Sequence, residues 1–199
     1  MVGAVLTQNT AWTNVEKAVT NLKDSDCLDP GKIIALPVTE LAGLIRPSGY
    51  FNIKAKRLRA LCVWYIEQGA HSQLSQWNTT ELRSALLAVH GVGPETADDI
   101  LLYAFHRPVF VIDTYTRRIF SRLGIFRDDL PYEDLRLNFE QALPTDSVLF
   151  NEYHALLVSH GKDICRKQPR CNLCCLERIC INPGFINRQS SGVKYEDFS

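Results

Sequence analysis

Apolar residues return along most of the chain with the spacing of one face of an α-helix. The segments they form end at Gly, Pro or Asp, and they do not alternate as strands do. Helices are expected at residues 2–6, 15–22, 40–45, 54–68, 80–89, 94–105, 114–123 and 151–160. The strand-like run Val109–Ile112 is too short to build a sheet, and residues 24–32 are expected to form a polar linker. The pattern predicts an all-α fold.

The character of the chain changes near Gly161, where apolar helix gives way to Cys, Arg, Lys and Pro. The tail at residues 188–199 contains Ser and Gly and is expected to be flexible. No stretch approaches the roughly 20 apolar residues of a membrane helix, and the first residues lack the basic part of a signal peptide. We therefore expect a cytoplasmic protein without membrane contact. Its natural form is expected to begin upstream of Met1, because an apolar helix starts there without a capping residue.

Charge is balanced over the 199 residues, with 22 Lys and Arg against 22 Asp and Glu. No overall positive field therefore attracts nucleic acid, and any such attraction must be local. Three basic runs are candidates, at residues 46–59, 117–122 and 162–170. Each run taken alone is more typical of a solvated surface than of a phosphate contact.

Five of the seven cysteines lie within sixteen residues near the end of the chain, unlike the spread of a disulfide framework. Four of them have the spacing Cys165-x5-Cys171-x2-Cys174-x5-Cys180. Thiolates this close repel one another unless a cation neutralises them, so the loop predicts a metal site. The spacing suits zinc and an iron-sulfur cluster about equally, and Cys175 is an alternative to Cys174. The other two cysteines, Cys27 and Cys62, are expected to behave as small apolar side chains.

Two predicted helices meet at the tight turn His90-Gly91-Val92-Gly93-Pro94. Glycine allows a positive φ and a close approach of the backbone to a ligand, and Pro94 suits the first position of a helix. The exposed amides of such a helix can hold an anion, and a nucleic-acid phosphate is a natural guest. Any tight turn between two helices can use the same residues, so a purely structural turn is the alternative.

Asp113 stands between the apolar run that ends at Ile112 and a basic helix. Asp is a favoured N-cap residue, and a cap is the simpler interpretation. A helix N-terminus also keeps a carboxylate ionised, and such a carboxylate can stabilise a cationic transition state or activate water. The two roles are compatible.

Three segments carry a resemblance to a known family: Ala4–Trp12, Arg46–Lys56 and Gly93–Asp98. Together they resemble the endonuclease III superfamily of DNA glycosylases, whose members share a helix-hairpin-helix, a Gly/Pro-rich loop and an Asp. They are most similar to the branch of MagIII-type 3-methyladenine DNA glycosylases. The resemblance covers residues 2–180 and implies a two-lobed all-α fold. A helical barrel with the hairpin would span residues 15–123, and residues 1–14 would pair with 124–187 in the second lobe.

The resemblance also implies roles for individual residues. Asp113 would be the catalytic carboxylate, and Gly91, Val92 and Gly93 would clamp a backbone phosphate through the turn. Gln8 would fill the gap left by a flipped nucleotide. Trp12 stands where the methyladenine branch stacks an aromatic ring on the extruded base, although a core aromatic of an amphipathic helix is equally expected at this position.

Glu95 is the most informative departure from the bifunctional members of the family. Those members place a Lys here, whose neutral amine attacks the sugar and forms a Schiff base. A carboxylate cannot do this, so the resemblance implies hydrolysis by water and no AP lyase step. The methyladenine branch also carries Glu here and uses it in the base pocket, while Glu in a first helical turn also complements the helix dipole.

In the iron-sulfur members, a similar C-terminal loop binds a 4Fe-4S cluster. The resemblance therefore implies that Cys165, Cys171, Cys174 and Cys180 hold such a cluster, with zinc as the alternative. The first interval is one residue shorter than the family pattern, which leaves Cys174 and Cys175 as alternatives for the third ligand.

The sequence as a whole predicts a monomeric, monofunctional base excision repair glycosylase acting on double-stranded DNA that contains a damaged base. An alkylated purine such as 3-methyladenine is the expected substrate. The methyladenine enzymes most similar in these motifs lack the cluster, so their substrate does not transfer directly. The alternatives are an endonuclease III-like glycosylase for oxidised or mismatched bases and a non-catalytic iron-sulfur protein that binds DNA.

Overall fold

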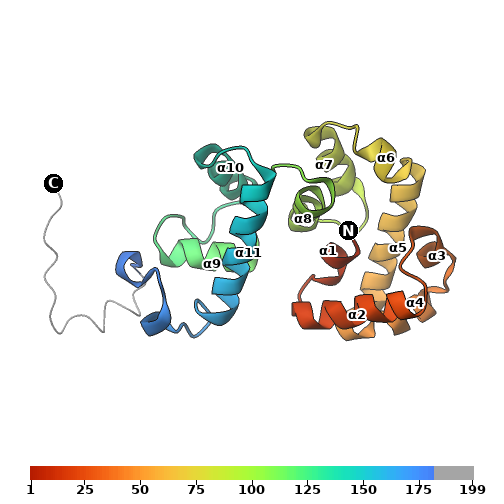
Figure 1. The fold of residues 1–199 in the computed structure, drawn as a ribbon, viewed down its shortest axis with the longest axis horizontal. Helices are drawn as coiled ribbons and strands as arrows, with labels where there is room; N and C mark the ends of the chain where they lie inside the picture. The colour runs from red at the N-terminus through yellow and green to blue at the C-terminus, as the bar shows by residue number, and fades with distance from the viewer. Residues whose placement is uncertain (182–199) are drawn as a thin grey trace, which may run out of the picture. The chain divides into compact units, whose positions relative to one another are not determined.

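The structure, a computed structural model, describes residues 1–181, and all regular secondary structure in this range is helical (Figure 1). The all-α prediction is therefore confirmed. The contacts divide the chain into two units, one from Met1 to Val109 and one that starts at Phe110. This division differs from the predicted boundaries at residues 14/15 and 123/124. The predicted pairing of residues 1–14 with 124–187 remains a prediction, and the tail 188–199 lies outside the described residues.

The first unit is built around one long helix, α5. The helices of this unit are α1 (Val2–Leu6), α2 (Trp12–Asp24), α3 (Pro30–Ala35), α4 (Val38–Leu44), the 3-10 turn η1 (Arg46–Ser48), α5 (Phe51–Glu67), α6 (Ala70–Leu74), α7 (Thr79–Ala88) and α8 (Pro94–Phe105). Helix α5 packs against α1, α3 and α4, while α7 packs against α8. The core residues Leu58, Leu86 and Leu101 are fully buried. Burial of this apolar surface is the main force that stabilises the unit.

The second unit packs α9 against α11 beside a cluster of aromatic rings. Its helices are α9 (Thr114–Arg122), α10 (Tyr132–Ala142), α11 (Ser147–Asp163) and the 3-10 turns η2 (Cys171–Leu173) and η3 (Glu177–Ile179). The ring of Phe110 stacks on Phe139 with centroids 4.2 Å apart, and Phe150 meets Phe110 edge to face. Such aromatic pairs add to the stability that burial alone provides.

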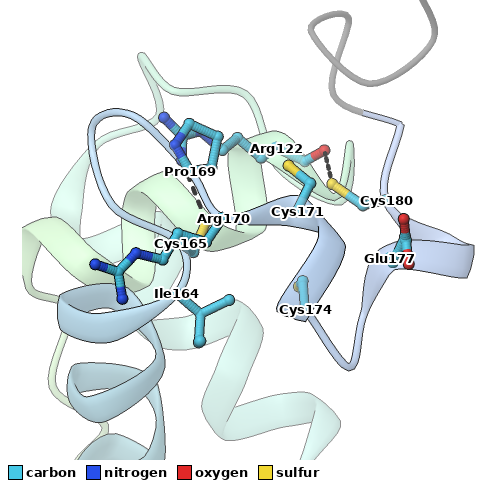
Figure 2. A pocket seen from close by; sticks show the side chains of 9 residues that line it. All are labelled: Arg122, Ile164, Cys165, Pro169, Arg170, Cys171, Cys174, Glu177 and Cys180. Atoms are coloured by element: carbon cyan, nitrogen blue, oxygen red, sulfur yellow. Dashed lines mark hydrogen bonds between the residues drawn. The ribbon is translucent and has the colours of Figure 1, made fainter. Parts of the chain in front are cut away.

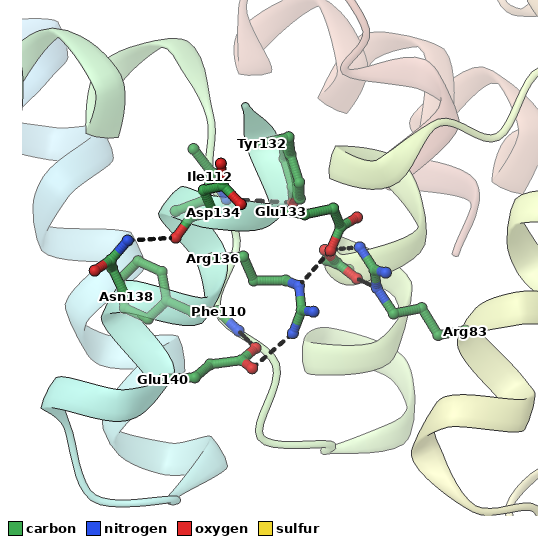
Figure 3. Close-up of polar contacts among 10 residues, drawn as sticks. Arg83, Phe110, Ile112, Tyr132, Glu133, Asp134, Arg136, Asn138 and Glu140 are labelled. Atoms are coloured by element: carbon green, nitrogen blue, oxygen red, sulfur yellow. Dashed lines mark hydrogen bonds and ion pairs between the residues drawn. The ribbon is translucent and has the colours of Figure 1, made fainter. Parts of the chain in front are cut away.

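The strand-like run Val109–Ile112 is buried, but within residues 1–181 it does not pair with a strand. Side chains of α10 accept hydrogen bonds from its backbone amides instead, as Figure 3 shows. Phe110 N donates to Glu140 Oε1 (3.0 Å), and Ile112 N donates to the Tyr132 hydroxyl (3.4 Å). Buried backbone donors need such partners. Arg136 in turn bonds to both Glu133 and Glu140, which holds the accepting carboxylate in place.

Two predictions about local structure were wrong or incomplete. Residues 24–32 are not wholly a linker, because α3 begins at Pro30, with Asp29 as its N-cap accepting from Lys32 N (3.0 Å). Asp followed by Pro is a helix-start signal that a composition-based assignment of a linker overlooks. Helices α6 and α10 were not predicted, since one is short and the other carries many charged residues.

No helix within residues 1–181 is long and apolar enough to cross a membrane.

Candidate functional site

The hairpin between α7 and α8 is shaped by Gly91. Its φ is +85°, and a Cβ built on it would lie 2.2 Å from Arg57 Cγ, so any other residue would both strain the backbone and collide. Val92 is buried and anchors the turn, whereas a Cβ on Gly93 would meet nothing within 4 Å. Gly91, Val92 and Gly93 were predicted to clamp a phosphate. Gly93 has open space beside it, and the buried Val92 can contribute only through its backbone.

Helix α8 begins at this turn with Gly93 as its N-cap and Pro94 in its first position. A glycine cap has no side-chain oxygen to accept the first amides of the helix. The helix is twelve residues long, so its dipole adds to the attraction for an anion. The turn thus has the local structure that the sequence predicted for a phosphate contact, and that contact itself remains a prediction.

An ion pair connects the two helices of the hairpin. Arg83 of α7 donates from Nε to Asp98 Oδ1 (2.6 Å) and from Nη2 to Oδ2 (3.0 Å), and Asp98 is completely buried. Two parallel bonds of this kind fix both distance and direction. The buried ion pair and the turn therefore both fix α7 relative to α8.

We expect Asp98→Asn to lower the free energy of unfolding by about 3 kcal/mol, because it leaves the Arg83 guanidinium facing a neutral amide in a buried site. Denaturant unfolding followed by circular dichroism measures this change. Asp24→Asn, at an exposed position in α2, is the control and should change the stability by under ~0.5 kcal/mol. Equal stability of the two variants would contradict a structural role for the pair.

Gln8 lies beside the hairpin. Its Nε2 donates to Thr96 Oγ1 (2.9 Å) and to the Gly91 carbonyl (3.2 Å), and its Oε1 accepts from Arg57 Nη1 (2.6 Å). The sequence places Gln8 and Thr96 88 positions apart, and the fold brings them into contact. Its predicted insertion into DNA remains a prediction, but its location next to the turn agrees with a shared binding role.

Trp12 is the first residue of α2 and is 56% exposed. The alternative interpretation as a core aromatic is therefore wrong. The ring lies over Gly3, where a Cβ would approach within 3.3 Å of it. An exposed ring held at one edge is available for stacking, and its stacking on an extruded base stays a prediction.

Asp113 is the N-cap of α9, and its Oδ1 accepts from the amide of Thr116 (2.7 Å). The cap predicted from the sequence is confirmed. Its other oxygen, Oδ2, lies 3.7 Å from Nε2 of His154 on α11. Burial alone would raise the pKa of Asp113, but the contact with His154 and the bond from Thr116 outweigh burial and hold it below its ordinary value. The carboxylate therefore stays ionised at neutral pH while only 8% exposed.

His154 is a site residue that sequence reasoning missed. It is buried, 41 positions after Asp113, and only the packing of α9 on α11 brings the two together. The one signal in the sequence is a His on the apolar face of a helix, which is more often a core residue than a functional one. A partner for Asp113 could not be chosen from this signal alone.

We expect His154→Gln to shift the acid limb of any activity that needs ionised Asp113 to higher pH. His154 lowers the pKa of Asp113 while burial raises it, so removing the imidazole raises the pKa of the carboxyl. The carboxylate is then protonated at a pH where the wild-type group is still charged. A pH–rate profile of base release measures the shift, and an unchanged acid limb would mean that His154 does not act on the charge of Asp113.

Glu95 is exposed and occupies the second position of α8, where it complements the helix dipole. It belongs to the first unit, whereas Asp113 belongs to the second. Their joint membership of one catalytic site therefore remains a prediction from the family resemblance.

The four cysteines of the predicted metal loop line one pocket, shown in Figure 2: Cys165, Cys171, Cys174 and Cys180. Cys175 is not among the lining residues and is exposed, so the structure brings Cys174 into the group and leaves Cys175 out. Within residues 1–181, no three His, Cys, Asp or Glu side chains form a group that could hold a metal ion. The residue types and the shared pocket nevertheless fit a thiolate-bound group.

Arginines of α9 connect this loop to the rest of the second unit by hydrogen bonds. Arg122 donates to the carbonyls of Arg166 (2.6 Å) and Lys167 (3.1 Å) and to the sulfur of Cys165 (3.3 Å). Arg118 donates to the carbonyls of Cys165 and Gly161, both at 2.8 Å. The positive charge near Cys165 suits a thiolate.

The interpretation of the basic runs as solvated or phosphate-binding surfaces needs correction for the arginines at 117–122 and for Lys54, whereas Arg46 and Lys56 are exposed as expected. In the run at 117–122, the arginines donate to carbonyl groups of the second unit. In the run at 46–59, Lys54 is buried and donates to the carbonyls of Leu6 (2.8 Å) and Ser48 (2.7 Å). Burial lowers the pKa of Lys54 to about 8, with the nearby Arg57 adding to the effect. These cations stabilise loops, which a sequence pattern cannot distinguish from surface charge.

Comparison with known proteins places this chain in a family. Residues 2–145 match the family described as HhH-GPD superfamily base excision DNA repair protein. The chain is 44% identical over 185 residues to "Putative DNA repair glycosylase MJ1434" of Methanocaldococcus jannaschii, which covers 92% of this chain and 84% of that protein. It is 27% identical over 182 residues to Endonuclease III of Sulfolobus acidocaldarius, covering 90% of this chain and 79% of that protein.

Solved structures agree with these relatives. The H. pylori 3-methyladenine DNA glycosylase MagIII bound to 1,N6-ethenoadenine matches with a TM-score of 0.73 and 32% identity over 81% of this chain and 82% of that one. A non-covalent Endonuclease III–DNA complex matches with a TM-score of 0.80 and 25% identity over 94% of this chain and 84% of that one. The resemblance noted in the sequence is thereby confirmed. The chain belongs to the HhH-GPD superfamily of base excision DNA repair proteins.

Proposed function

We propose that this protein is a monofunctional DNA glycosylase that hydrolyses the N-glycosidic bond of a damaged base in double-stranded DNA. The observation that carries the proposal is Asp113, a buried carboxylate kept ionised at the start of α9 beside His154. A fixed negative charge of this kind stabilises positive charge that develops on a substrate. The family supports a DNA glycosylase, and the absence of Lys at position 95 supports cleavage by water.

In the proposed reaction the bond between the sugar C1′ and the base nitrogen breaks, and the bonding electrons leave with the base. The sugar becomes oxocarbenium-like, and the Asp113 carboxylate stabilises this cation or orients the attacking water. The water oxygen then bonds to C1′ and its proton is released, which leaves an abasic site. Glu95 has no neutral amine to form a Schiff base, so strand cleavage would be left to another enzyme.

We propose an alkylated purine such as 3-methyladenine as the substrate. A cationic alkylated base is already a good leaving group, so one carboxylate and aromatic stacking can suffice. The exposed ring of Trp12 supports this proposal, as does the likeness to a MagIII structure that contains 1,N6-ethenoadenine. The protein would act as a monomer on chromosomal DNA in the cytoplasm, and the hairpin turn would contact a backbone phosphate.

We propose that the Cys pocket holds a 4Fe-4S cluster with Cys165, Cys171, Cys174 and Cys180 as ligands. Each thiolate would bind one iron, and the cluster would cross-link the segment 165–180 that follows α11. The exposure of Cys175 supports Cys174 as the third ligand. Zinc is the alternative for the same four thiols.

Chromatography of bases released from methylated duplex DNA tests the proposed activity. Release of 3-methyladenine without strand cleavage is expected, and borohydride should trap no covalent adduct with DNA. A trapped adduct would contradict the monofunctional assignment. Release only from oxidised or mismatched duplexes would support the endonuclease III-like alternative, which the likeness to Endonuclease III favours. No release from any lesion, with DNA binding intact, would support a non-catalytic role.

A further inference from the structure

Both N–H groups of the Gln8 side-chain amide have partners within the first unit. Both of its N–H groups donate, one to the Thr96 hydroxyl and one to the Gly91 carbonyl, and its oxygen accepts from the Arg57 guanidinium at 2.6 Å. A glutamine amide has two N–H groups in all. In this arrangement Gln8 therefore has no N–H left for a base or for the DNA backbone.

The partners of Gln8 are themselves firmly held. Thr96 is 5% exposed within α8, and the stem of Arg57 lies directly against Gly91, where an added Cβ would be 2.2 Å from its Cγ. One helical turn before Arg57, Lys54 donates to the carbonyl of Leu6, at the end of α1. Residues of α5 thus hold the backbone just before Gln8, and residues of α5 and α8 hold the Gln8 side chain.

The bond from Arg57 is short and involves a charged donor, which makes it stronger than a neutral hydrogen bond. Any contact that an N–H of Gln8 makes with DNA must replace its bond to Thr96 or to the Gly91 carbonyl. Loss of the Thr96 acceptor destabilises the bound arrangement of the amide, because the freed N–H would lie in a partly buried site without a partner.

We infer that Arg57 and Thr96 are positioning residues that hold Gln8 against the hairpin in the free protein, and that Gln8 leaves Thr96 when the protein engages damaged DNA. The inference rests on the proposed function and on the role that the family resemblance implies for Gln8, which is to fill the gap beside an extruded nucleotide. Breaking these hydrogen bonds of Gln8 then costs free energy, which the contacts with DNA must offset. Weakening them in the free protein should strengthen binding.

Thr96→Val tests this inference, since valine keeps the shape and removes the acceptor. We expect it to bind a duplex with a tetrahydrofuran abasic site about fivefold more tightly than the wild type, from the lower end of the cost of an unpaired donor. The effect should vanish in the Gln8→Ala background, because no amide remains to be released. Thr96→Ser, which keeps the hydroxyl, should behave as the wild type, and so should the exposed Thr80→Val on α7.

Equal or weaker binding by folded Thr96→Val, with normal binding by the wild type, would overturn the inference and leave the proposed function intact. Failure of the wild type to prefer the abasic duplex over undamaged DNA would overturn both. If Thr96→Val does not fold, Arg57→Met serves instead, because it removes the donor and keeps the stem over Gly91. Its effect on the same affinity should differ between the Gln8 and Gln8→Ala backgrounds, and identical effects would overturn the inference.

Discussion

Asp113→Asn is expected to reduce the single-turnover rate of base release by about 10³-fold while leaving the affinity for lesion-containing duplex nearly unchanged. Asparagine is as good an N-cap as aspartate, so the bond from the Thr116 amide can persist and α9 should begin as before. The substitution removes the negative charge. In the wild type, the contact with His154 and the bond from the Thr116 amide keep the carboxyl group ionised. Quenched-flow measurement of free base, together with fluorescence anisotropy of labelled duplex, separates rate from binding.

Asp146→Asn is the matched control for this substitution. Asp146 is the N-cap of α11 in the same unit, and its Oδ1 accepts from the amide of Val148 (2.8 Å). The chemical change and the helical position are the same, but this carboxylate is exposed and has no His beside it in the described contacts. Its rate should equal that of the wild type. A rate for Asp113→Asn within severalfold of the control would refute the proposed role of the carboxylate.

The helices that were predicted correctly are those whose local signals agree with their packing. Helix α8 runs from Pro94 to Phe105, the predicted bounds, because Gly93 and Pro94 mark its start and its apolar residues face the core. Asp113 was recognised for the same reason, since a capping residue before a helix is a local feature. Helix α10 shows the opposite case. Its buried face is formed by Leu135 and Phe139, and the many charged residues around them make the helical pattern hard to recognise in the sequence.

The candidate site was predicted only as far as its residues act through their own neighbours in sequence. Asp113 and the cysteines could be named from local patterns, and Gln8 from the family resemblance. The partners of Asp113 and Gln8, which are His154, Arg57 and Thr96, lie 41 to 88 positions away and meet them only in the fold. Cations were the least predictable group, since Lys54 and Arg122 donate to carbonyls that no pattern identifies. Partner choice is a tertiary property, whereas residue type and spacing are local.

Cys174→Ser is expected to remove the brown colour, the visible absorption and the acid-labile sulfide of protein purified without oxygen, because a 4Fe-4S cluster needs four cysteine ligands. Cys174 lines the pocket together with the other three cysteines. The second unit should also unfold at a lower temperature, since Arg118 and Arg122 hold the loop by carbonyl bonds that the cluster would reinforce. Iron and sulfide analysis, with calorimetry, measures both effects.

Cys175→Ser is the control one position away, at an exposed thiol outside the pocket. It should keep the iron, the sulfide and the absorption of the wild type, because its side chain is not needed by the cluster. The reverse result, colour lost with Cys175→Ser and kept with Cys174→Ser, would show that the ligand register is shifted by one residue. Colourless wild-type protein with one bound zinc would refute the cluster and support a single-ion site, since zinc gives no visible absorption and takes the same four thiols. The pair of variants therefore tests the identity of the bound group and the register of the loop together, because only the residue that lines the pocket should affect either.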